Sequence, residues 1–188
     1  MNLPNKLTII RMVLTPIFLF VFMAPFIPYH YFIGLAVYVA GCITDFLDGK
    51  IARKYNLITP FGKLADPVAD KMLTTAALLA LMNEGLCSLY IVFIVLTREF
   101  AVPSVRLAAS AQGVVIPANI WGKAKTVSQM VSTILIMLLI AINSTGILPT
   151  SFPLAIISQV LLWITAVLAV ISGIIYIKDG VKQIDFSK

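Results

Sequence analysis

Four aspartates in the first half of the chain have the type and spacing to bind divalent cations. Asp45 and Asp48 are three residues apart, and Asp66 and Asp70 are four apart. Side chains at these spacings share one face of a helix, so each pair presents two carboxylates together. Carboxylate oxygens suit Mg²⁺ or Mn²⁺, and four carboxylates are enough for two ions with shared ligands. The spacing therefore predicts a site for divalent cations.

Long apolar segments must position these carboxylates. Hydrophobic residues make up 60% of the 188 residues and charged residues 12%, whereas soluble domains have about 45–50% and about 25%. This composition excludes an ordinary soluble enzyme, and it excludes a disordered chain. Residues 12–44 and 126–177 contain no Asp, Glu, Lys or Arg.

Prolines and turn residues divide the chain into six segments near the length of about 20 residues that crosses a bilayer as a helix. Leu3, Leu7 and Ile10 recur at helical spacing before the first of them. We therefore predict an all-α polytopic membrane protein, one domain over residues 1–188, with six transmembrane helices and a short N-terminal interfacial helix. The interfacial helix is expected at about 2–8 and the spans at about 8–27, 31–53, 62–82, 86–106, 122–142 and 153–177.

The positive charges are distributed asymmetrically along these spans. All 14 Lys and Arg residues, which give a net charge of +6, fall on the side that holds both termini and the connections 54–61 and 107–121. The positive-inside rule makes this side cytoplasmic. We expect a multi-pass protein of the cell membrane with the carboxylates on its cytoplasmic side. The basic charge then reflects topology and anionic lipid rather than nucleic-acid binding.

Small residues and a cation accompany the aspartates. Gly41, Gly49 and Ala52 lie at helical spacing beside Asp45 and Asp48, where they allow either ligand access or close helix packing. Gly62 clears space in the same way before Asp66, and Arg53 places a cation where phosphate charge could be neutralised. No Cys, His or Ser arrangement predicts a covalent intermediate.

The run Asp45-x-x-Asp48-Gly49-x-x-Ala52-Arg53, then eight residues, then Gly62-x-x-x-Asp66-x-x-x-Asp70, resembles the signature of the CDP-alcohol phosphotransferase family at every fixed position. The resemblance implies transfer of a phosphatidyl group from CDP-diacylglycerol to an alcohol, with release of CMP. It implies two divalent ions, Mg²⁺ or Mn²⁺, on the four aspartates, and Asp70 as general base. It also implies a homodimer. The implied CDP-lipid site comprises Gly49, Ala52, Arg53, Gly62, Thr8 and Arg11.

Three further stretches resemble the family members that use glycerol-3-phosphate as the acceptor. They are Asn2-Leu-Pro-Asn5, Thr97-Arg-Glu-Phe100 and Gly122-Lys-Ala-Lys-Thr126. Near them lie four cations that could bind the acceptor phosphate, although such residues also set topology: Arg98, Arg106, Lys123 and Lys125. Glu99 interrupts an apolar span and is expected to pair with a nearby cation.

Two alternatives stay open on the sequence alone. The first is the same chemistry with another acceptor, namely phosphatidylglycerol, inositol phosphate or serine. The second is a divalent-cation transporter. Transporters commonly bind ions near the bilayer midplane between repeated halves, whereas here the aspartates lie at one end of the spans and the two halves do not match. A structural scaffold would leave the aspartates unexplained.

Overall fold

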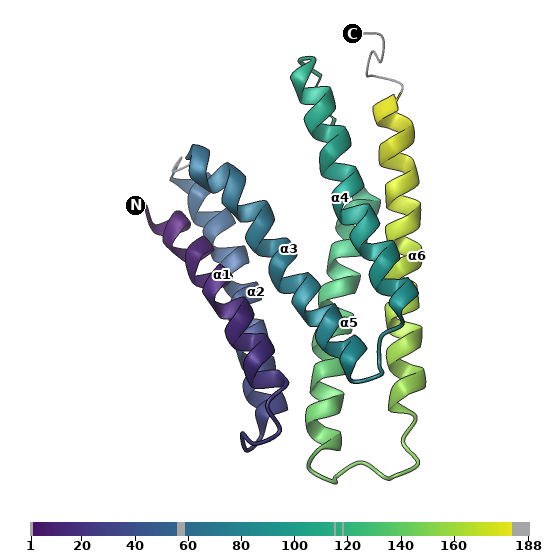
Figure 1. Ribbon diagram of the computed structural model, residues 1–188. Coiled ribbons are helices and arrows are strands. Elements are labelled where there is room, and N and C mark those ends of the chain that lie inside the picture. Colours follow the sequence, from purple (N-terminus) through teal and green to yellow (C-terminus); the bar gives the residue numbers. More distant parts are fainter. Residues whose placement is uncertain (1, 56–58, 115, 118, 182–188) are drawn as a thin grey trace. The chain divides into compact units, whose positions relative to one another are not determined.

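Six helices make up the described part of this computed structural model, which comprises residues 2–55, 59–114, 116, 117 and 119–181 (Figure 1). No strand occurs within these residues, which confirms the all-α prediction. Each predicted span corresponds to one helix. The helices are α1 Leu3–Phe22, α2 His30–Lys54, α3 Pro60–Asn83, α4 Leu89–Ala111, α5 Ile120–Asn143 and α6 Leu154–Val181.

The N-terminal segment does not form the separate interfacial helix that we expected at about 2–8. The Asn2 side chain accepts a hydrogen bond from Asn5 N at 3.1 Å and caps a helix that starts at Leu3 and continues to Phe22. Residues 3–8 are therefore the first turns of α1. The helix also ends earlier than residue 27, because Pro25 and Pro28 follow and disfavour helix at and before their positions.

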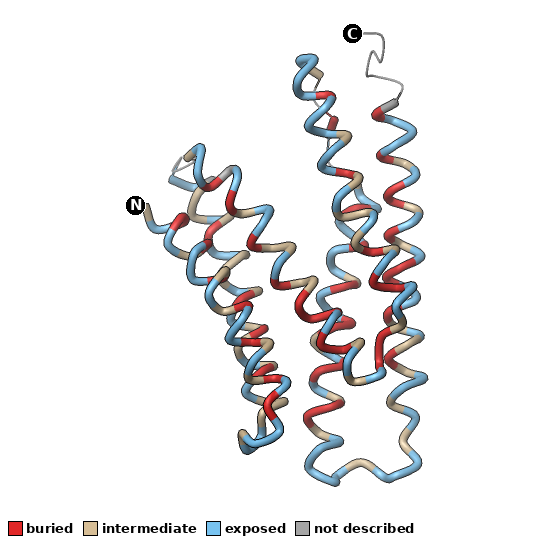
Figure 2. Tube along the Cα trace, viewed as in Figure 1, coloured by how far each residue is buried: buried red, intermediate tan, exposed pale blue. Residues whose placement is uncertain are grey.

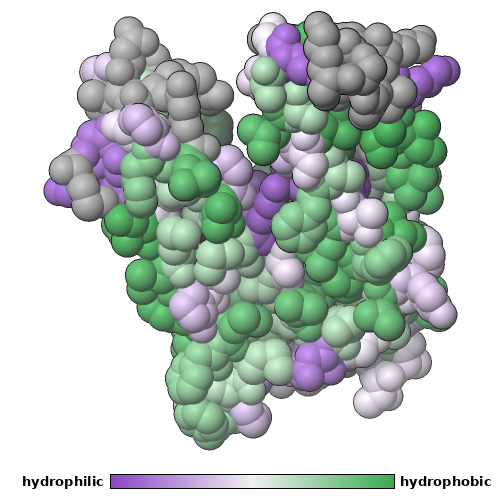
Figure 3. Space-filling view, turned by 45° about the horizontal axis from the view of Figure 1, so that its top comes forward, coloured by the Kyte–Doolittle hydropathy of each residue, from purple (hydrophilic) through white to green (hydrophobic). Residues whose placement is uncertain are grey.

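Burial along α1 is inverted relative to a helix of a soluble protein. Thr8 and Arg11 are completely buried, whereas Ile10 is 46% exposed and Val13 is 53% exposed. Figure 2 shows buried residues interspersed with exposed ones along the helices, and Figure 3 shows broad hydrophobic areas on the visible face. Apolar side chains outside and polar ones inside are expected when lipid surrounds the helices.

Within the described residues, four helices are long and apolar enough to cross a membrane: Leu3–Phe22, His30–Ala52, Ile120–Asn143 and Leu154–Gly180. Helices α3 and α4 have similar lengths, 24 and 23 residues, but they contain charged residues of the motif and of the Arg98-Glu99 pair. The four apolar helices indicate a membrane protein. That all six helices cross the membrane stays a prediction.

The helices belong to two units. Unit 1 comprises residues 1–84 and 134–154, and unit 2 comprises residues 85–133 and 155–188. In unit 1, α1 packs against both α2 and α3, and the rings of Phe18, Phe22 and Tyr38 form part of its core. In unit 2, Val102 and Ala109 of α4 pack with Tyr176 of α6. Each unit holds one of the two polar clusters described next.

Candidate active site

The two aspartates of α2 share one cation from α1. Arg11 Nη1 lies 2.9 Å from Asp45 Oδ1, and Arg11 Nη2 donates a hydrogen bond to Asp48 Oδ2. The side chains of Arg11 and Asp48 are 0% and 4% exposed, whereas that of Asp45 is 47% exposed. One buried guanidinium therefore bridges both carboxylates, and Asp45 forms the accessible side of the group.

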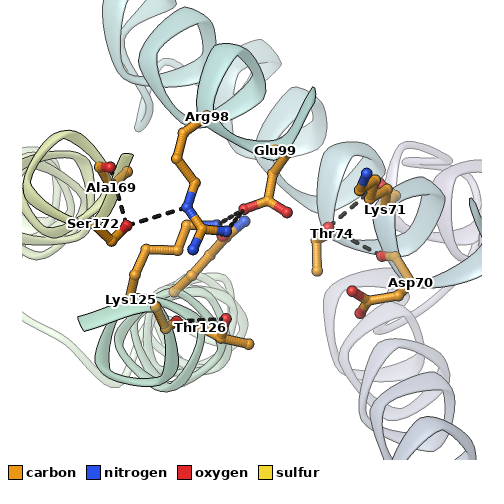
Figure 4. A network of polar contacts seen from close by, with 11 residues as sticks. Asp70, Lys71, Thr74, Arg98, Glu99, Lys125, Thr126, Ala169 and Ser172 are labelled. Carbon is orange, nitrogen blue, oxygen red and sulfur yellow. Dashed lines mark hydrogen bonds and ion pairs between the residues drawn. The ribbon is translucent and has the colours of Figure 1, made fainter. Parts of the chain in front are cut away.

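Helix α3 reaches the same face of α1. Thr8 Oγ1 donates a hydrogen bond to Asp66 Oδ1, and Thr8 precedes Arg11 by three residues, so both lie on one face of α1. Asp66 also lies within electrostatic range of Asp48. Asp70 follows one turn later on α3, where its carbonyl oxygen accepts a hydrogen bond from Thr74 Oγ1 at 3.0 Å (Figure 4). One face of α1 thus connects acidic residues of α2 and α3.

Asn5 and Thr59 join α1 to the start of α3, and the sequence patterns assigned neither of them a role in the site. Thr59 Oγ1 donates to Asn5 Oδ1 at 2.9 Å and accepts from Gly62 N at 3.0 Å. A Cβ at Gly62 would lie 3.0 Å from Asn5 Oδ1 and 3.3 Å from Thr59 Oγ1, so a side chain at this position would crowd the contact between these two residues. The signal in the sequence is a buried polar stripe at spacings of three and four on α1: Asn5, Thr8, Arg11 and Thr15.

The small residues of α2 fall into two groups. A Cβ at Gly41 would lie 2.6 Å from Leu73 Cδ2 of α3, which supports close packing as the role of Gly41. Gly49 and Ala52 are half-buried further along α2, and their predicted contact with the CDP-lipid stays a prediction. Arg53 is also predicted to contact the CDP-lipid, but its side chain lies outside the described part of the structure.

The aspartates have the right donor atoms for divalent cations, but their side chains are not arranged around a common ion. All-oxygen donors from two helices suit a hard cation such as Mg²⁺. As the side chains stand, however, no group of three or more His, Cys, Asp or Glu among the described residues is arranged to hold a metal ion. Arg11 and Thr8 already contact three of the predicted ligands, Asp45, Asp48 and Asp66. Metal binding by the aspartates therefore requires side-chain rearrangement.

A second polar cluster lies in unit 2. Figure 4 shows Arg98 and Glu99 of α4 and Lys125 of α5 pointing toward one another. Lys125 Nζ donates to Glu99 Oε1 and to Gln129 Oε1. Arg98 Nη1 donates to Glu99 Oε1 at 3.0 Å, and Arg98 Nε donates to Ser172 Oγ of α6 at 3.1 Å. The expected pairing of Glu99 with a nearby cation is confirmed.

Two of the four cations predicted for the acceptor phosphate, Arg98 and Lys125, belong to this cluster, and a third, Arg106, is linked to it through Tyr176. The guanidinium carbons of Arg98 and Arg106 lie 6.0 and 5.7 Å from the centre of the Tyr176 ring, so both arginines lie beside the same residue. Lys125 is only 2% exposed. Lys123 is exposed and lies on another face of α5, two residues before Lys125. The structure brings Arg98, Arg106 and Lys125 together and leaves Lys123 apart.

The buried thiol outside the helices is a poor nucleophile. Cys87 lies in the segment of chain that connects α3 to α4, and it is 4% exposed. Burial raises the pKa of its thiol to about 11, so the thiol stays protonated near neutral pH.

The amino-acid sequence is similar to those of known phosphatidyltransferases. Residues 1–171 match the family described as CDP-alcohol phosphatidyltransferase. The CDP-diacylglycerol–glycerol-3-phosphate 3-phosphatidyltransferase of Bacillus subtilis is 37% identical over 183 residues, which cover 92% of this chain and 91% of the relative. The Rickettsia bellii protein of the same name is 36% identical over 94% of each chain. A probable phosphatidylglycerophosphate synthase of Mycobacterium tuberculosis is 36% identical over 97% of this chain and 83% of its own length.

Proposed function

The chain belongs to the CDP-alcohol phosphatidyltransferase family, and from this premise we propose that it transfers the phosphatidyl group of CDP-diacylglycerol to glycerol-3-phosphate. The products are phosphatidylglycerophosphate and CMP, and the reaction serves phosphatidylglycerol synthesis. The observation that carries the choice of acceptor is the near full-length similarity to relatives whose names state this reaction. It favours glycerol-3-phosphate over phosphatidylglycerol, inositol phosphate and serine.

The reaction is a direct displacement at phosphorus. A hydroxyl oxygen of glycerol-3-phosphate attacks the β-phosphorus of CDP-diacylglycerol and forms the new oxygen–phosphorus bond. The bond from that phosphorus to the bridging oxygen breaks, and CMP leaves with the oxygen. Asp70 accepts the hydroxyl proton, as a carboxylate within the site can do in the transition state.

The family uses divalent cations. Two of them, Mg²⁺ or Mn²⁺, held by Asp45, Asp48, Asp66 and Asp70, would neutralise the diphosphate and stabilise the departing CMP. The convergence of α1, α2 and α3 on these side chains supports this assignment. The CDP-lipid site comprises Gly49, Ala52, Arg53 and Gly62, with Thr8 and Arg11 from α1.

The acceptor phosphate binds between Arg98 and Arg106, with Lys123 and Lys125 adding positive charge. Arginine offers paired N–H donors that match a phosphate group, and the shared position of the two arginines beside Tyr176 supports this site. Arg106→Ala should raise the KM for glycerol-3-phosphate more than the KM for CDP-diacylglycerol. An unchanged KM for glycerol-3-phosphate would move the acceptor site elsewhere.

In the cell, the chain acts as a homodimer in the cytoplasmic membrane. It forms one membrane domain of six spans, with both termini and the carboxylates on the cytoplasmic side. The placement of every Lys and Arg at that side of the six spans supports this orientation.

The deciding experiment measures CMP release from CDP-diacylglycerol by the purified chain. Each acceptor is tested separately: glycerol-3-phosphate, phosphatidylglycerol, inositol phosphate and serine. Glycerol-3-phosphate should give the fastest release, EDTA should abolish it, and added Mg²⁺ or Mn²⁺ should restore it. Equal release with all four acceptors would refute the assigned substrate.

The role of Asp70 has its own test, with a control at the C-cap of the same helix. Asp70→Asn should abolish turnover while CDP-diacylglycerol still binds. Glu84→Gln makes the same carboxylate-to-amide change at the other end of α3, where Tyr31 donates to Glu84, and should leave turnover near normal. Near-normal turnover of Asp70→Asn would remove Asp70 as the base.

A further inference from the structure

Arg11 has hydrogen-bonding capacity that its protein partners do not use. The side chain is completely buried, and Nη2 donates to Asp48. Nη1 faces Asp45 as an ion pair, yet Nη1 and Nε have no hydrogen-bond partner among the described residues. A guanidinium carries five N–H donors, and buried donors without acceptors are uncommon in folded proteins. Charge holds this side chain in place, and donors remain for an anion.

The partners of Arg11 are also the predicted metal ligands of α2. A divalent ion needs several carboxylate oxygens in its first coordination shell, and its charge repels a guanidinium held on the same oxygens. On the basis of the proposed function, we propose that Arg11 and a divalent ion are alternative partners of Asp45 and Asp48. The diphosphate of the CDP-lipid draws Arg11 away by accepting its unused N–H donors.

The exchange of Arg11 for a divalent ion explains why one arginine and two aspartates meet where α1 contacts α2. Before the nucleotide binds, Arg11 offsets the repulsion between Asp45 and Asp48. When the diphosphate arrives, its charge attracts both the guanidinium and the metal, and the metal takes over the carboxylates. The half-exposed Asp45 provides the open side for entry of the ion. Nucleotide and metal therefore strengthen each other's binding.

The first test measures Mn²⁺ binding to the purified chain in detergent, using the electron paramagnetic resonance signal of free Mn²⁺. No lipid substrate is present. Arg11→Gln should bind Mn²⁺ about tenfold more tightly or better, because a competing unit charge within a few ångströms is gone. Arg11→Lys keeps the charge and should stay within about threefold of the unsubstituted chain. Lys6→Gln removes an exposed cation from the same helix and should leave Mn²⁺ affinity nearly unchanged, because solvent screens its charge.

The second test adds cytidine diphosphate, which carries the diphosphate without acyl chains. It should tighten Mn²⁺ binding to the unsubstituted chain beyond the affinity of the nucleotide itself for Mn²⁺. The gain should be several-fold smaller in Arg11→Gln, where no guanidinium needs to be displaced. If Arg11→Gln does not fold, the unsubstituted chain and Arg11→Lys decide the matter through this gain alone.

A folded Arg11→Gln variant with unchanged or weaker Mn²⁺ affinity would overturn the inference, because Arg11 would then support the metal site instead of competing for it. The absence of a gain with cytidine diphosphate, or of saturable Mn²⁺ binding to the unsubstituted chain, would do the same. The proposed reaction fails separately, if CDP-diacylglycerol and glycerol-3-phosphate yield no CMP while the Mn²⁺ results hold.

Discussion

Glu99 should be a major contributor to the stability of unit 2. It accepts hydrogen bonds from Lys125 and Arg98, and Lys125 is 2% exposed. Glu99→Gln keeps the size of the side chain and removes its charge. Lys125 would then be a buried cation that has lost its contact with a carboxylate at position 99 and keeps its hydrogen bond to the amide oxygen of Gln129.

The size of the effect follows from the burial of each partner. Removing one member of a buried ion pair typically costs about 3–5 kcal/mol. The side chains of Glu99 and Arg98 are 17% and 13% exposed, so water or headgroups can solvate part of the charge. We therefore expect Glu99→Gln to lower the free energy of unfolding by about 3 kcal/mol, the low end of that range. The double variant Glu99→Gln/Lys125→Met also removes the buried charge of Lys125 and should recover most of this loss.

The assay is unfolding in mixed dodecyl sulfate micelles, followed by circular dichroism. Glu84→Gln is the matched control, because its amide oxygen can still accept the hydrogen bond from Tyr31. Its effect should stay within about 0.5 kcal/mol. A Glu99→Gln variant as stable as the control, or a double variant no more stable than the single one, would refute the argument.

The same double variant tests the acceptor role of Lys125. If its charge binds the phosphate of glycerol-3-phosphate, the refolded double variant will have a higher KM for this substrate. An unchanged KM would make Lys125 a structural residue that holds Glu99 and Arg98 in place.

Three other predictions follow from single contacts. Gly41→Val should lower the free energy of unfolding in the same micelles by about 1–3 kcal/mol, because the added Cβ would clash with Leu73. An unchanged stability would contradict the close packing of α2 on α3. Thr59→Ala should cost about 1 kcal/mol through loss of the α3 cap, whereas Thr59→Ser keeps the hydroxyl and most of the stability; equal losses would rule out the hydroxyl as the cause. In a Cys42→Ala background, maleimide should modify Cys87 very slowly at pH 8. The rate should rise about tenfold per pH unit up to about pH 11, because burial raises the pKa of the thiol to about 11. Rapid modification at pH 7 would contradict this, since the thiol would then be accessible and ionised.

Local sequence was enough to find the helices and the residues that share their faces. Apolar segments bounded by prolines and turn residues predicted the positions of α2, α3, α5 and α6 to within a few residues, because a helix in lipid has to satisfy its backbone internally. The first helix was less well predicted. Its start depends on one cap, Asn2, and on the continuity of the turns that follow, which composition does not report.

The identity of the partners required the tertiary structure. Arg11 and Asp48 are 37 residues apart in the sequence, and nothing local to either residue indicates that they touch. Lys123 and Lys125 have the same chemistry and nearly the same position, yet one is exposed and the other is buried against Glu99. The sequence alone determined a membrane protein with four aspartates on two helix faces. Only the packing of the helices decided which cations meet the carboxylates, because periodicity defines a face of a helix and not the neighbour that covers it.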